Sequence, residues 1–370
     1  MDIPSELLIP EKTLFKKDAA LALGAEASVF GSKGMIVYGR SLESPDKLSG
    51  ILGHLRPAMT AVRYCRAKSG EPELEEISAV IDDGRKHGVE WIAGIGGGSV
   101  LDLAKAAAGL FRAARPPAYY QEGGVLEERG IPFIAVPTTA GTGSEATTNS
   151  VIINPSKKTK LSIRDSSFLA RRVILDAGLM EGIPPEIVAH AGMDALVQAY
   201  ESYISKNASW LTRSLALKAV SLINEHLAGA YRTRGEDDLS ALLLGSYLCG
   251  IAFSHSRLGV IHGVAHPIGA LYHLPHGLIC SLCLIPSIQI NRKAMGERYD
   301  ELSAAVGVDL LDRVAELLAS LEITSPFKNL PVIEREKIIE ETLASGSTAA
   351  NPKKIKRDDV EQILGALFEQ

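Results

Sequence analysis

Short apolar runs alternate with helical segments through the first half of the chain. The run GMIVYG (34–39) and the run WIAGI (91–95) are apolar and bounded by glycine, as buried strands are, and residues 72–87 between them have apolar side chains at helical spacing. Further strands are predicted at 59–65, 131–136 and 173–176, and further helices at 45–55 and 96–110. This alternation predicts a parallel, Rossmann-like sheet covered by helices on both faces, with ligands bound beyond the carboxyl ends of its strands.

The pattern changes near residue 180. The segment 181–185, EGIPP, interrupts regular structure and restarts it, because proline suits the first turn of a helix. Almost everything beyond has helical spacing with few β-branched runs. A chain of 370 residues is long enough for two domains. The sequence therefore predicts an α/β domain over residues 1–180 and an all-α domain over residues 181–370.

Charge and hydropathy exclude several partners. The formal net charge is -5, which gives no electrostatic reason to expect binding to nucleic acid or to an anionic membrane. No apolar run approaches the roughly 18 residues that span a bilayer. The first residues, MDIPSELLIPEK, lack the basic start and apolar core of a signal peptide. We therefore expect a cytoplasmic protein.

The chain has four cysteines, which suits a reducing compartment better than a disulfide framework. Cys280 and Cys283 form a CxxC, but no second pair accompanies it. The surrounding run, LICSLCLIP, is typical of a buried helix. The pattern favours a structural role for this pair over a redox or zinc role.

Two glycine-rich loops follow predicted strands. Gly96–Ser99 leads into a helix, where glycines let a phosphate approach the backbone and the helix terminus offers free N–H groups and a partial positive charge. A tight turn would also need glycine, so this loop alone leaves both interpretations open. The second loop, PTTAGTGSE (137–145), is rich in hydroxyls, and its alternative is a solvated polar loop. Together they favour a dinucleotide, with Asp102 and Lys105 on the first turns of the helix, although the usual GxGxxG fingerprint is absent.

Four of the nine histidines lie within the segment 259–277, GVIHGVAHPIGALYHLPHG. His262 and His266 are four residues apart and share one face of a helix. Pro267 predicts a kink or break there, which would bring His276 back toward the first pair. Imidazole is the commonest side chain for binding a transition metal and for moving a proton near neutral pH. A cluster of this density favours such chemistry over satisfied core or surface residues.

A predicted helix at 185–204 contributes a carboxylate. Asp194 lies among small and apolar residues, with Gln198 four residues later on the same face. A carboxylate buried there costs several kcal/mol unless an arginine, a helix N-terminus or a metal ion compensates it. This helix alone leaves those three open, and the histidine cluster in the same domain favours the metal.

Four segments resemble the iron-containing (group III) alcohol dehydrogenase family. They are GIGGGSVLDLAK (94–105), PTTAGTGSE (137–145), HAGMDALVQAYESY (190–203) and GVIHGVAHPIGALYHLPHG (259–277), in the order in which the family has them. The resemblance covers nearly the whole chain. It implies a dehydroquinate synthase-like architecture, with an N-terminal dinucleotide domain, a C-terminal helical domain and the active site in the cleft between them.

The resemblance also implies roles for individual residues. The pyrophosphate would contact Gly97, Gly98 and Ser99, and the rest of the cofactor would contact Thr138, Thr139, Thr142 and Ser144, with Asp102 beside them. The metal ligands would be Asp194, His262 and His276. His266 would lie beside the nicotinamide and act in catalysis rather than as a primary ligand. Asn149 and Phe253 match positions that face the substrate.

The chain departs from the family pattern at two positions. Gln198 replaces the family's fourth ligand, a histidine, and His255 replaces an asparagine. Relatives such as glycerol dehydrogenases manage with one aspartate and two histidines. We therefore expect Gln198 to be a weak fourth ligand or a donor to bound water, and metal to bind more tightly to a Gln198→His variant. His255 is disfavoured as a substitute ligand, because it lies about 10 Å along a helix from His262.

The function implied is metal-dependent hydride transfer between NAD(P) and a small primary or secondary alcohol or aldehyde, with Fe²⁺ or Zn²⁺ as the metal and a homodimer as the assembly. NADP is expected over NAD, because Gly39 stands where NAD-preferring members have an aspartate, and Arg40 and Ser41 add charge and a donor. A plain surface turn is the alternative there. The competing functions are a lyase of the 3-dehydroquinate synthase type, which would need a cluster of basic residues near the histidines, a metal-poor reductase, and a non-enzymatic binding protein.

Overall fold

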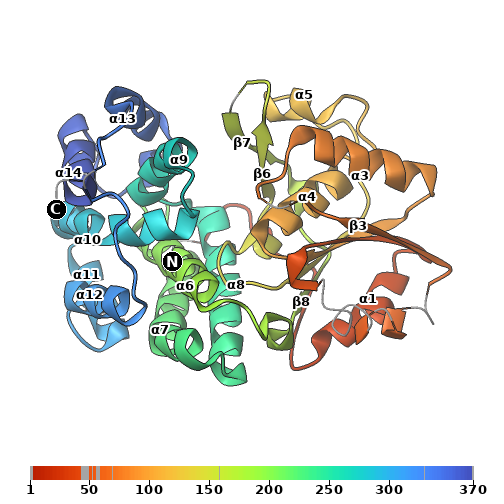
Figure 1. Cartoon of the computed structure of the whole chain (residues 1–370), viewed down its shortest axis with the longest axis horizontal. Coiled ribbons are helices and arrows are strands. Elements are labelled where there is room, and N and C mark those ends of the chain that lie inside the picture. The colour runs from red at the N-terminus through yellow and green to blue at the C-terminus, as the bar shows by residue number, and fades with distance from the viewer. Residues whose placement is uncertain are drawn as a thin grey trace. The chain divides into compact units, whose positions relative to one another are not determined.

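The computed structural model describes residues 3–42, 50–51, 53–55, 59–68, 70–157, 159–328 and 330–368. The chain forms two compact units. One contains Leu8–Thr139 and Gly143–Ile183, and the other contains the residues up to Leu7, the stretch Ala140–Thr142 and the residues from Pro184 onward. Strands belong to the first unit and long helices fill the second (Figure 1).

The first unit is built on a six-stranded sheet in which every pairing is parallel, in the order β1-β8-β5-β4-β2-β3. Its strands are β1 (Lys12–Phe15), β2 (Lys33–Tyr38), β3 (Ala61–Arg66), β4 (Trp91–Gly96), β5 (Phe133–Pro137) and β8 (Arg172–Leu175). The predicted parallel, Rossmann-like sheet is confirmed. Sequence analysis missed the exposed edge strand β1 and the antiparallel hairpin of β6 (Asn149–Asn154) and β7 (Thr159–Arg164).

Helices cover both faces of this sheet (Figure 1). The helices of this unit are α1 (Leu23–Ser28), α3 (Leu74–Lys86), α4 (Gly98–Gly109) and α5 (Pro117–Gln121), with short 3₁₀ turns at Ala19–Ala22, Arg40–Leu42, Ser144–Ala146, Ser166–Phe168 and Ala177–Met180. The helix α4 is alanine-rich and buried from Val100 onward, so it packs closely on β4. A Cβ on Gly94 would come within 2.8 Å of the Ala104 Cβ. Of the helix predicted at 45–55, residues 50–51 and 53–55 are helical, and 45–49 and 52 lie outside the described residues.

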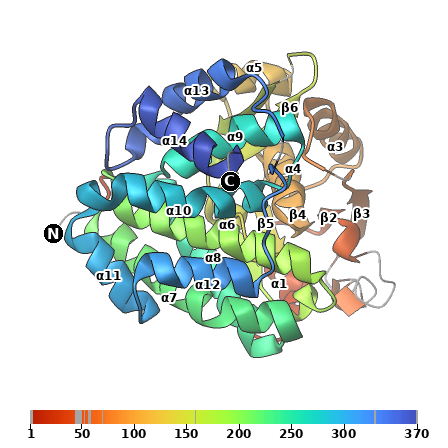
Figure 2. The same cartoon turned by 60° about the vertical axis from the view of Figure 1, so that its left-hand side comes forward.

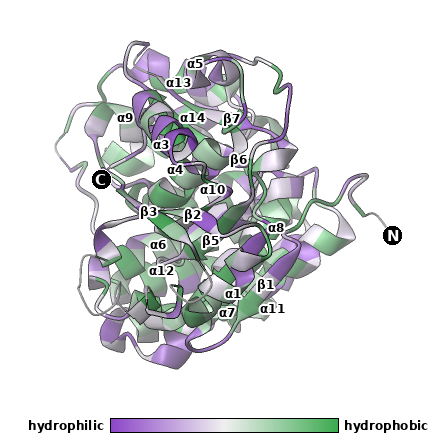
Figure 3. Ribbon diagram, turned by 90° about the vertical axis from the view of Figure 1, so that its right-hand side faces the viewer, coloured by the Kyte–Doolittle hydropathy of each residue, from purple (hydrophilic) through white to green (hydrophobic). Residues whose placement is uncertain are grey.

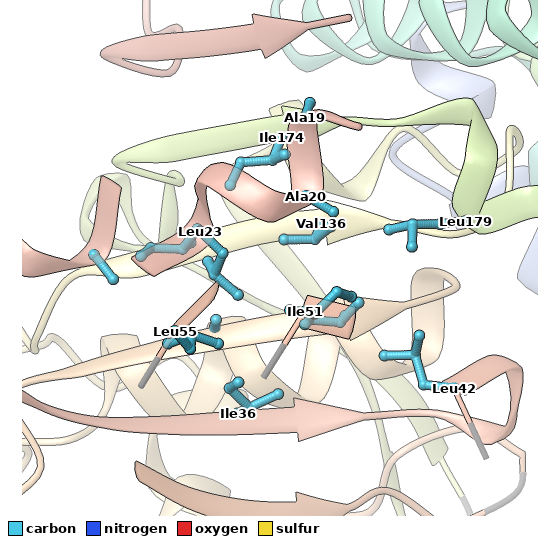
Figure 4. Packing of buried hydrophobic residues seen from close by; sticks show 14 of the residues in the cluster. Ala19, Ala20, Leu23, Ile36, Leu42, Ile51, Leu55, Val136, Ile174 and Leu179 are labelled. Carbon is cyan, nitrogen blue, oxygen red and sulfur yellow. The ribbon is translucent and has the colours of Figure 1, made fainter. Parts of the chain in front are cut away.

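One apolar cluster fills the space between α1 and the sheet. Leu23 contributes from α1, and Ile36, Val136 and Ile174 contribute from three strands (Figure 4). The Trp91 ring is fully buried in the same cluster, and a Cβ on Gly34 would come within 1.9 Å of it. This cluster fixes the positions of the strand ends from which the loops leave.

The strand order reverses beside β4. From β2 the chain moves outward to β3, then crosses back to β4 and continues in the other direction to β5 and β8. The connections after β2 and β4 therefore leave in opposite directions, and such a point is where open α/β sheets bind ligands. Both predicted glycine-rich loops and the Gly39–Ser41 segment follow strands at this end.

The second unit is helical, as predicted. Its helices are α6 (Pro185–Ile204), α7 (Trp210–Thr233), α8 (Glu236–Ser256), α9 (Val260–Tyr272), α10 (His276–Met295), α11 (Glu297–Val306), α12 (Leu310–Ser320), α13 (Arg335–Ala344) and α14 (Arg357–Phe368), with a 3₁₀ turn at Thr348–Ala350. The predicted helix at 185–204 matches α6, which is buried along most of its length. It packs against α7, α8 and α10 (Figure 2). The central position of α6 explains why its sequence has almost no polar face.

Sequence analysis predicted a kink or a break at Pro267, and the break is wrong. Helix α9 continues through Pro267 to Tyr272. The chain turns instead at His273, whose backbone is in the left-handed region with φ 54°, and α10 begins at His276 directly after Pro275. The expected outcome, His276 returning toward His262, is reached through this turn.

Among the described helices, α8 is long and apolar enough to cross a membrane by length and composition. Of its most apolar window, 61% is buried inside the protein. In the ribbon coloured by hydropathy, hydrophobic and hydrophilic residues are interspersed over the chain as a whole (Figure 3). A single helix of this kind is weak evidence for a membrane span, because the core helix of a globular protein passes the same test.

Candidate functional site

Four side chains of the helical unit bring metal-binding atoms together. Asp194 comes from α6, His262 from α9, and His276 and Cys280 from the first turns of α10. Their ligand atoms all lie within 4.8 Å of one another. Three of the four are the residues that sequence analysis named, and Cys280 is new.

The buried atoms of this group lack the partners that buried polar atoms normally have. The Nε2 atom of His262 lies 3.4 Å from Oδ1 of Asp194, and Nε2 of His276 lies 3.8 Å from the same oxygen. Neither the Asp194 Oδ1 atom nor the His262 Nε2 atom has a hydrogen-bond partner among the described residues. Burying two polar atoms that face each other without hydrogen-bond partners costs folding free energy unless a cation lies between them and accepts their lone pairs. The donor set therefore fits a divalent metal ion.

Glu201, which sequence analysis missed, orients His262. Its Oε2 atom accepts a hydrogen bond of 2.6 Å from His262 Nδ1, and its Oε1 atom accepts one of 2.6 Å from the Ile261 backbone N–H. The carboxylate is 1% exposed and lies at the N-terminus of α9, where the helix dipole favours negative charge. A proton on Nδ1 leaves the Nε2 lone pair of His262 directed at the group. Its spacing in the sequence could have identified Glu201, because it follows Asp194 by seven residues and lies on the same face of α6.

The charges of the group are coupled. Burial alone would raise the pKa of Asp194, but the His262 and His276 rings outweigh it and lower the pKa. Burial disfavours a charged His262, yet the carboxylates of Asp194 and Glu201 raise its pKa to about 9. Burial and the Asp194 carboxylate raise the pKa of the Cys280 thiol well above its ordinary value.

Gln198 lies beside the group with its amide turned toward Asp194. Its Nε2 atom donates to Asp194 Oδ2 at 2.9 Å, and its Oε1 atom lies 3.9 Å from the Cys249 sulfur. Gln198 is 4% exposed. The amide therefore fixes one oxygen of Asp194 and leaves the other facing the histidines.

His266 is exposed and stacks on His276, with ring centroids 5.3 Å apart. It is not among the four ligand residues. His255 is also outside that group, and its Nδ1 atom is 2.8 Å from the Ile251 carbonyl oxygen. Phe253, on the same helix, is half-buried.

Close helix approach sets the position of the ligands. A Cβ on Gly277 would lie 2.1 Å from the His190 carbonyl oxygen of α6, so glycine allows the start of α10 to lie against that helix. A Cβ on Gly259 would lie 2.7 Å from Oε1 of Glu201. These two glycines therefore allow His276 to approach Asp194 and Glu201 to reach the start of α9.

The strand ends of the α/β unit place the predicted nucleotide residues. Gly97 precedes α4 without any capping side chain, and Gly98 and Ser99 open the helix, where backbone N–H groups lack helical acceptors. Thr138 directly follows β5, and its hydroxyl is 3.0 Å from that of Ser41. The Thr139 side chain lies beside Gly97. The Gly97, Ser41 and Thr138 segments are thus brought to one edge of the sheet.

Asp102 and Lys105 hold the second loop. Asp102 Oδ1 accepts a 2.5 Å hydrogen bond from Ser144, and its Oδ2 accepts one from the Val151 backbone. The Lys105 ammonium is fully buried among four oxygens, those of the Ser144 carbonyl and hydroxyl, the Thr147 hydroxyl and the Asn149 carbonyl, at 2.6–2.9 Å. Burial raises the pKa of Asp102 and lowers that of Lys105. Asp102, Lys105 and Ser144 therefore contact one another.

The structure also shows the positions of three further residues that sequence analysis expected near the cofactor or the substrate. Thr142 is exposed and belongs with the helical unit, where Gly141 lies against Ala191. Asn149 begins β6 and is half-buried. Gly39 is buried directly after β2, and a Cβ there would come within 2.8 Å of a Val100 methyl.

Comparison with known proteins identifies the chain. The model of the iron-containing alcohol dehydrogenase family matches residues 10–177, and the model of the C-terminal domain of Fe-containing alcohol dehydrogenases matches residues 188–368. A probable alcohol dehydrogenase, EutG of Escherichia coli (strain K12), is 35% identical over 85% of this chain and 82% of that protein. The chain belongs to the iron-containing alcohol dehydrogenase family. Sequence analysis predicted this membership, and it is confirmed.

Other relatives support the same family assignment. An NADPH-dependent butanol dehydrogenase from Clostridium saccharobutylicum is 29% identical over 91% of this chain and 92% of that protein. The crystal structure of sulfoacetaldehyde reductase from Bifidobacterium kashiwanohense in complex with NAD⁺ matches with a TM-score of 0.92 and 26% identity, covering 99% of both chains. This iron-containing alcohol dehydrogenase homologue is an alcohol dehydrogenase or aldehyde reductase, as predicted, and the lyase alternative is not favoured.

Proposed function

We propose that the chain reduces a small aldehyde with NADPH, and oxidises the matching alcohol with NADP⁺, using one divalent metal ion held by Asp194, His262 and His276. The observation that carries this proposal is the pair of buried, facing and unsatisfied atoms, Asp194 Oδ1 and His262 Nε2, with His276 Nε2 beside them. When bound, Fe²⁺ or Zn²⁺ acts as a Lewis acid on the oxygen of the alcohol or aldehyde.

The charges of the ligands suit that role. Of these three ligands, Asp194 offers one negative charge and the neutral histidines offer none, so these three alone would leave a divalent ion with a net positive charge. Glu201 holds His262 in the tautomer that presents Nε2 to the ion. We assign Gln198 to positioning rather than to weak ligation, because its amide already binds Asp194 Oδ2.

His266 is proposed as the proton-moving group. Its ring is exposed and stacks on His276, so it is next to the ligands without being one of them. A histidine there can move the hydroxyl proton of the alcohol toward solvent, or return one to the oxygen in the reverse direction.

The strand-end loops are proposed to bind the nucleotide. The uncapped start of α4 at Gly97–Ser99 offers backbone N–H groups and a partial positive charge to the pyrophosphate. Thr138, Thr139 and Thr142 are proposed to contact the rest of the cofactor. Asp102 and Ser144 are proposed to affect cofactor binding by holding the loop in place, because their polar atoms bind each other and Lys105.

The preference for NADP is proposed from the end of β2. Gly39 leaves this position without a carboxylate to repel a 2′-phosphate, and Arg40 and Ser41 are exposed directly after it. One relative is named as NADPH-dependent, which supports the proposal. Asn149 and Phe253 are proposed to face the substrate. A homodimer is proposed from the family resemblance, and a cytoplasmic location from the cysteine usage and from the sequence of the first residues.

The test is a screen of short aldehydes and alcohols with NADPH and NADH, using chelator-treated protein with and without Fe²⁺ or Zn²⁺. We expect steady consumption of NADPH by an aldehyde, dependent on metal, with a higher kcat/KM than with NADH. Equal or better kcat/KM with NADH would refute the cofactor preference, and the absence of net cofactor consumption with every substrate would contradict the proposed reaction.

A further inference from the structure

Cys280 lies one helical turn after His276 on α10, and its sulfur is 3.5 Å from His276 Nε2. The side chain is fully buried and forms no disulfide. Its Sγ atom lies within 4.8 Å of the ligand atoms of Asp194, His262 and His276. The thiol thus shares the small volume toward which the three proposed ligands converge.

The separations of these atoms suit tetrahedral coordination. Metal–ligand distances of about 2.0–2.3 Å at tetrahedral angles place ligand atoms about 3.3–3.6 Å apart. The pair His262 Nε2 and Asp194 Oδ1 is 3.4 Å apart, and the pair Cys280 Sγ and His276 Nε2 is 3.5 Å apart. The third pair, His276 Nε2 and Asp194 Oδ1, is 3.8 Å apart. Small shifts of side chains would bring all four atoms onto one ion, and the substrate oxygen would then be a fifth ligand.

Two independent features point to a ligand at this place. Asp194 Oδ1 and His262 Nε2 are buried, face the group and have no hydrogen-bond partner among the residues that the structure describes. Gln198, where the family pattern has its fourth ligand, is turned away toward Asp194 Oδ2 and Cys249. Cys280, rather than Gln198, therefore lies where a fourth ligand of this group would be.

We propose that Cys280 is the fourth protein ligand of the metal, and that its thiolate shifts the selectivity of the site from Fe²⁺ toward Zn²⁺. This inference rests on the proposed function, which requires the metal. On binding, the S–H bond breaks, its proton leaves to solvent, and the sulfur electron pair forms the bond to the metal. No electron is transferred, so the ion stays divalent. Thiolate is a soft ligand and suits zinc better than the imidazole and carboxylate set does alone.

Cobalt provides a direct test, because Co²⁺ bound to a thiolate has an intense charge-transfer absorption in the near ultraviolet. The chain has four cysteines, so a Cys65→Ser, Cys249→Ser, Cys283→Ser triple variant retains Cys280 alone. We expect this triple variant and the wild type to show the absorption after chelator treatment and addition of Co²⁺. A Cys280→Ser variant should lose it while still binding the ion, and Cys283→Ser, on the same buried helix, is the matched control that should keep it.

Affinity adds a second readout. Competition with a chelator should show that Cys280→Ser weakens Zn²⁺ binding by at least about tenfold. Its ratio of Zn²⁺ to Fe²⁺ affinity should also fall relative to the wild type and to Cys283→Ser.

The outcomes separate this inference from the proposed function. Bound Co²⁺ without the thiolate absorption in the wild type would overturn the role of Cys280 and leave the three-ligand metal site standing. Failure of the wild type to bind Zn²⁺, Fe²⁺ or Co²⁺ at all would overturn both. If Cys280→Ser does not fold, the spectrum of the triple variant still decides, because Cys280 is then the one thiol available.

Discussion

Glu145 makes the stability of the α/β unit depend on pH. The side chain is 2% exposed, and its Oε1 atom has no hydrogen-bond partner among the described residues. Burial raises its pKa from the ordinary value of 4.5 to about 7, against the opposing influence of its own backbone N–H and of Lys105. The folded protein therefore holds this proton at pH values where the unfolded chain has lost it.

The sign follows from proton binding. Below about pH 4.5 both states are protonated and Glu145 imposes no pH-dependent cost. Between pH 4.5 and about pH 7 the folded state binds more protons, so the free energy of unfolding falls as pH rises. Above about pH 7 the full cost persists. A rise from 4.5 to about 7 corresponds to about 3 kcal/mol, at about 1.4 kcal/mol per pH unit.

A Glu145→Gln variant removes this titration. We expect its stability advantage over the parent to grow by about 2–3 kcal/mol between about pH 5 and about pH 8. Urea unfolding in a Trp210→Phe background would leave Trp91, buried in β4, as the one tryptophan reporting on the α/β unit. Glu128→Gln removes an exposed carboxylate of the same unit and serves as the control for lost charge. A difference between Glu145→Gln and the parent that stays constant with pH would refute the reasoning.

Four further predictions concern the sites. Glu201→Gln should weaken metal binding by roughly 10–100-fold in a chelator competition, because His262 loses its orienting carboxylate, and unchanged affinity would contradict this role. His266→Ala should keep its metal, measured by elemental analysis, and lose most of its kcat, whereas loss of metal in proportion to activity would make His266 a ligand. Gly39→Asp should shift the kcat/KM ratio toward NAD and lower the Tm through the 2.8 Å contact with Val100, and a Val100→Ala change should restore the Tm if that contact is the cause. Gly277→Ala should destabilise the protein by about 1–3 kcal/mol and weaken metal binding, because the new methyl lies 2.1 Å from the His190 carbonyl, while Gly269→Ala, with its nearest neighbour at 3.5 Å, should do neither.

The sequence predicted those elements whose apolar pattern matches their burial. β2, β4 and β5 are buried strands bounded by glycine or proline, and α6 is an apolar helix beginning at Pro185. β1 was missed because it is four residues long with both ends exposed, which gives no apolar run. The partial alternation of β6 was too weak to predict the hairpin without knowing what covers it.

The candidate site shows a similar limit. Asp194 and the four-histidine segment stood out because aspartate and histidine are unusual among apolar residues, and the choice of His262 and His276 as expected ligands came from the family resemblance. Glu201 was missed because a glutamate near a helix end is ordinarily solvated, and its burial depends on where α9 begins. Cys280 was assigned to the core because a cysteine among leucines and isoleucines has no periodic signal of ligation. Its place beside His276 and Asp194 depends on how α10 packs on α6.

The most direct test of this account is a metal titration of the chelator-treated enzyme, following NADPH oxidation by a short aldehyde that the screen has identified. The account predicts negligible activity without metal, recovery that saturates near one Zn²⁺ or Fe²⁺ per chain, and no recovery in an Asp194→Ala variant that still binds NADPH. Full activity in protein shown by elemental analysis to contain no metal would contradict it, as would full recovery in Asp194→Ala at the same metal concentration.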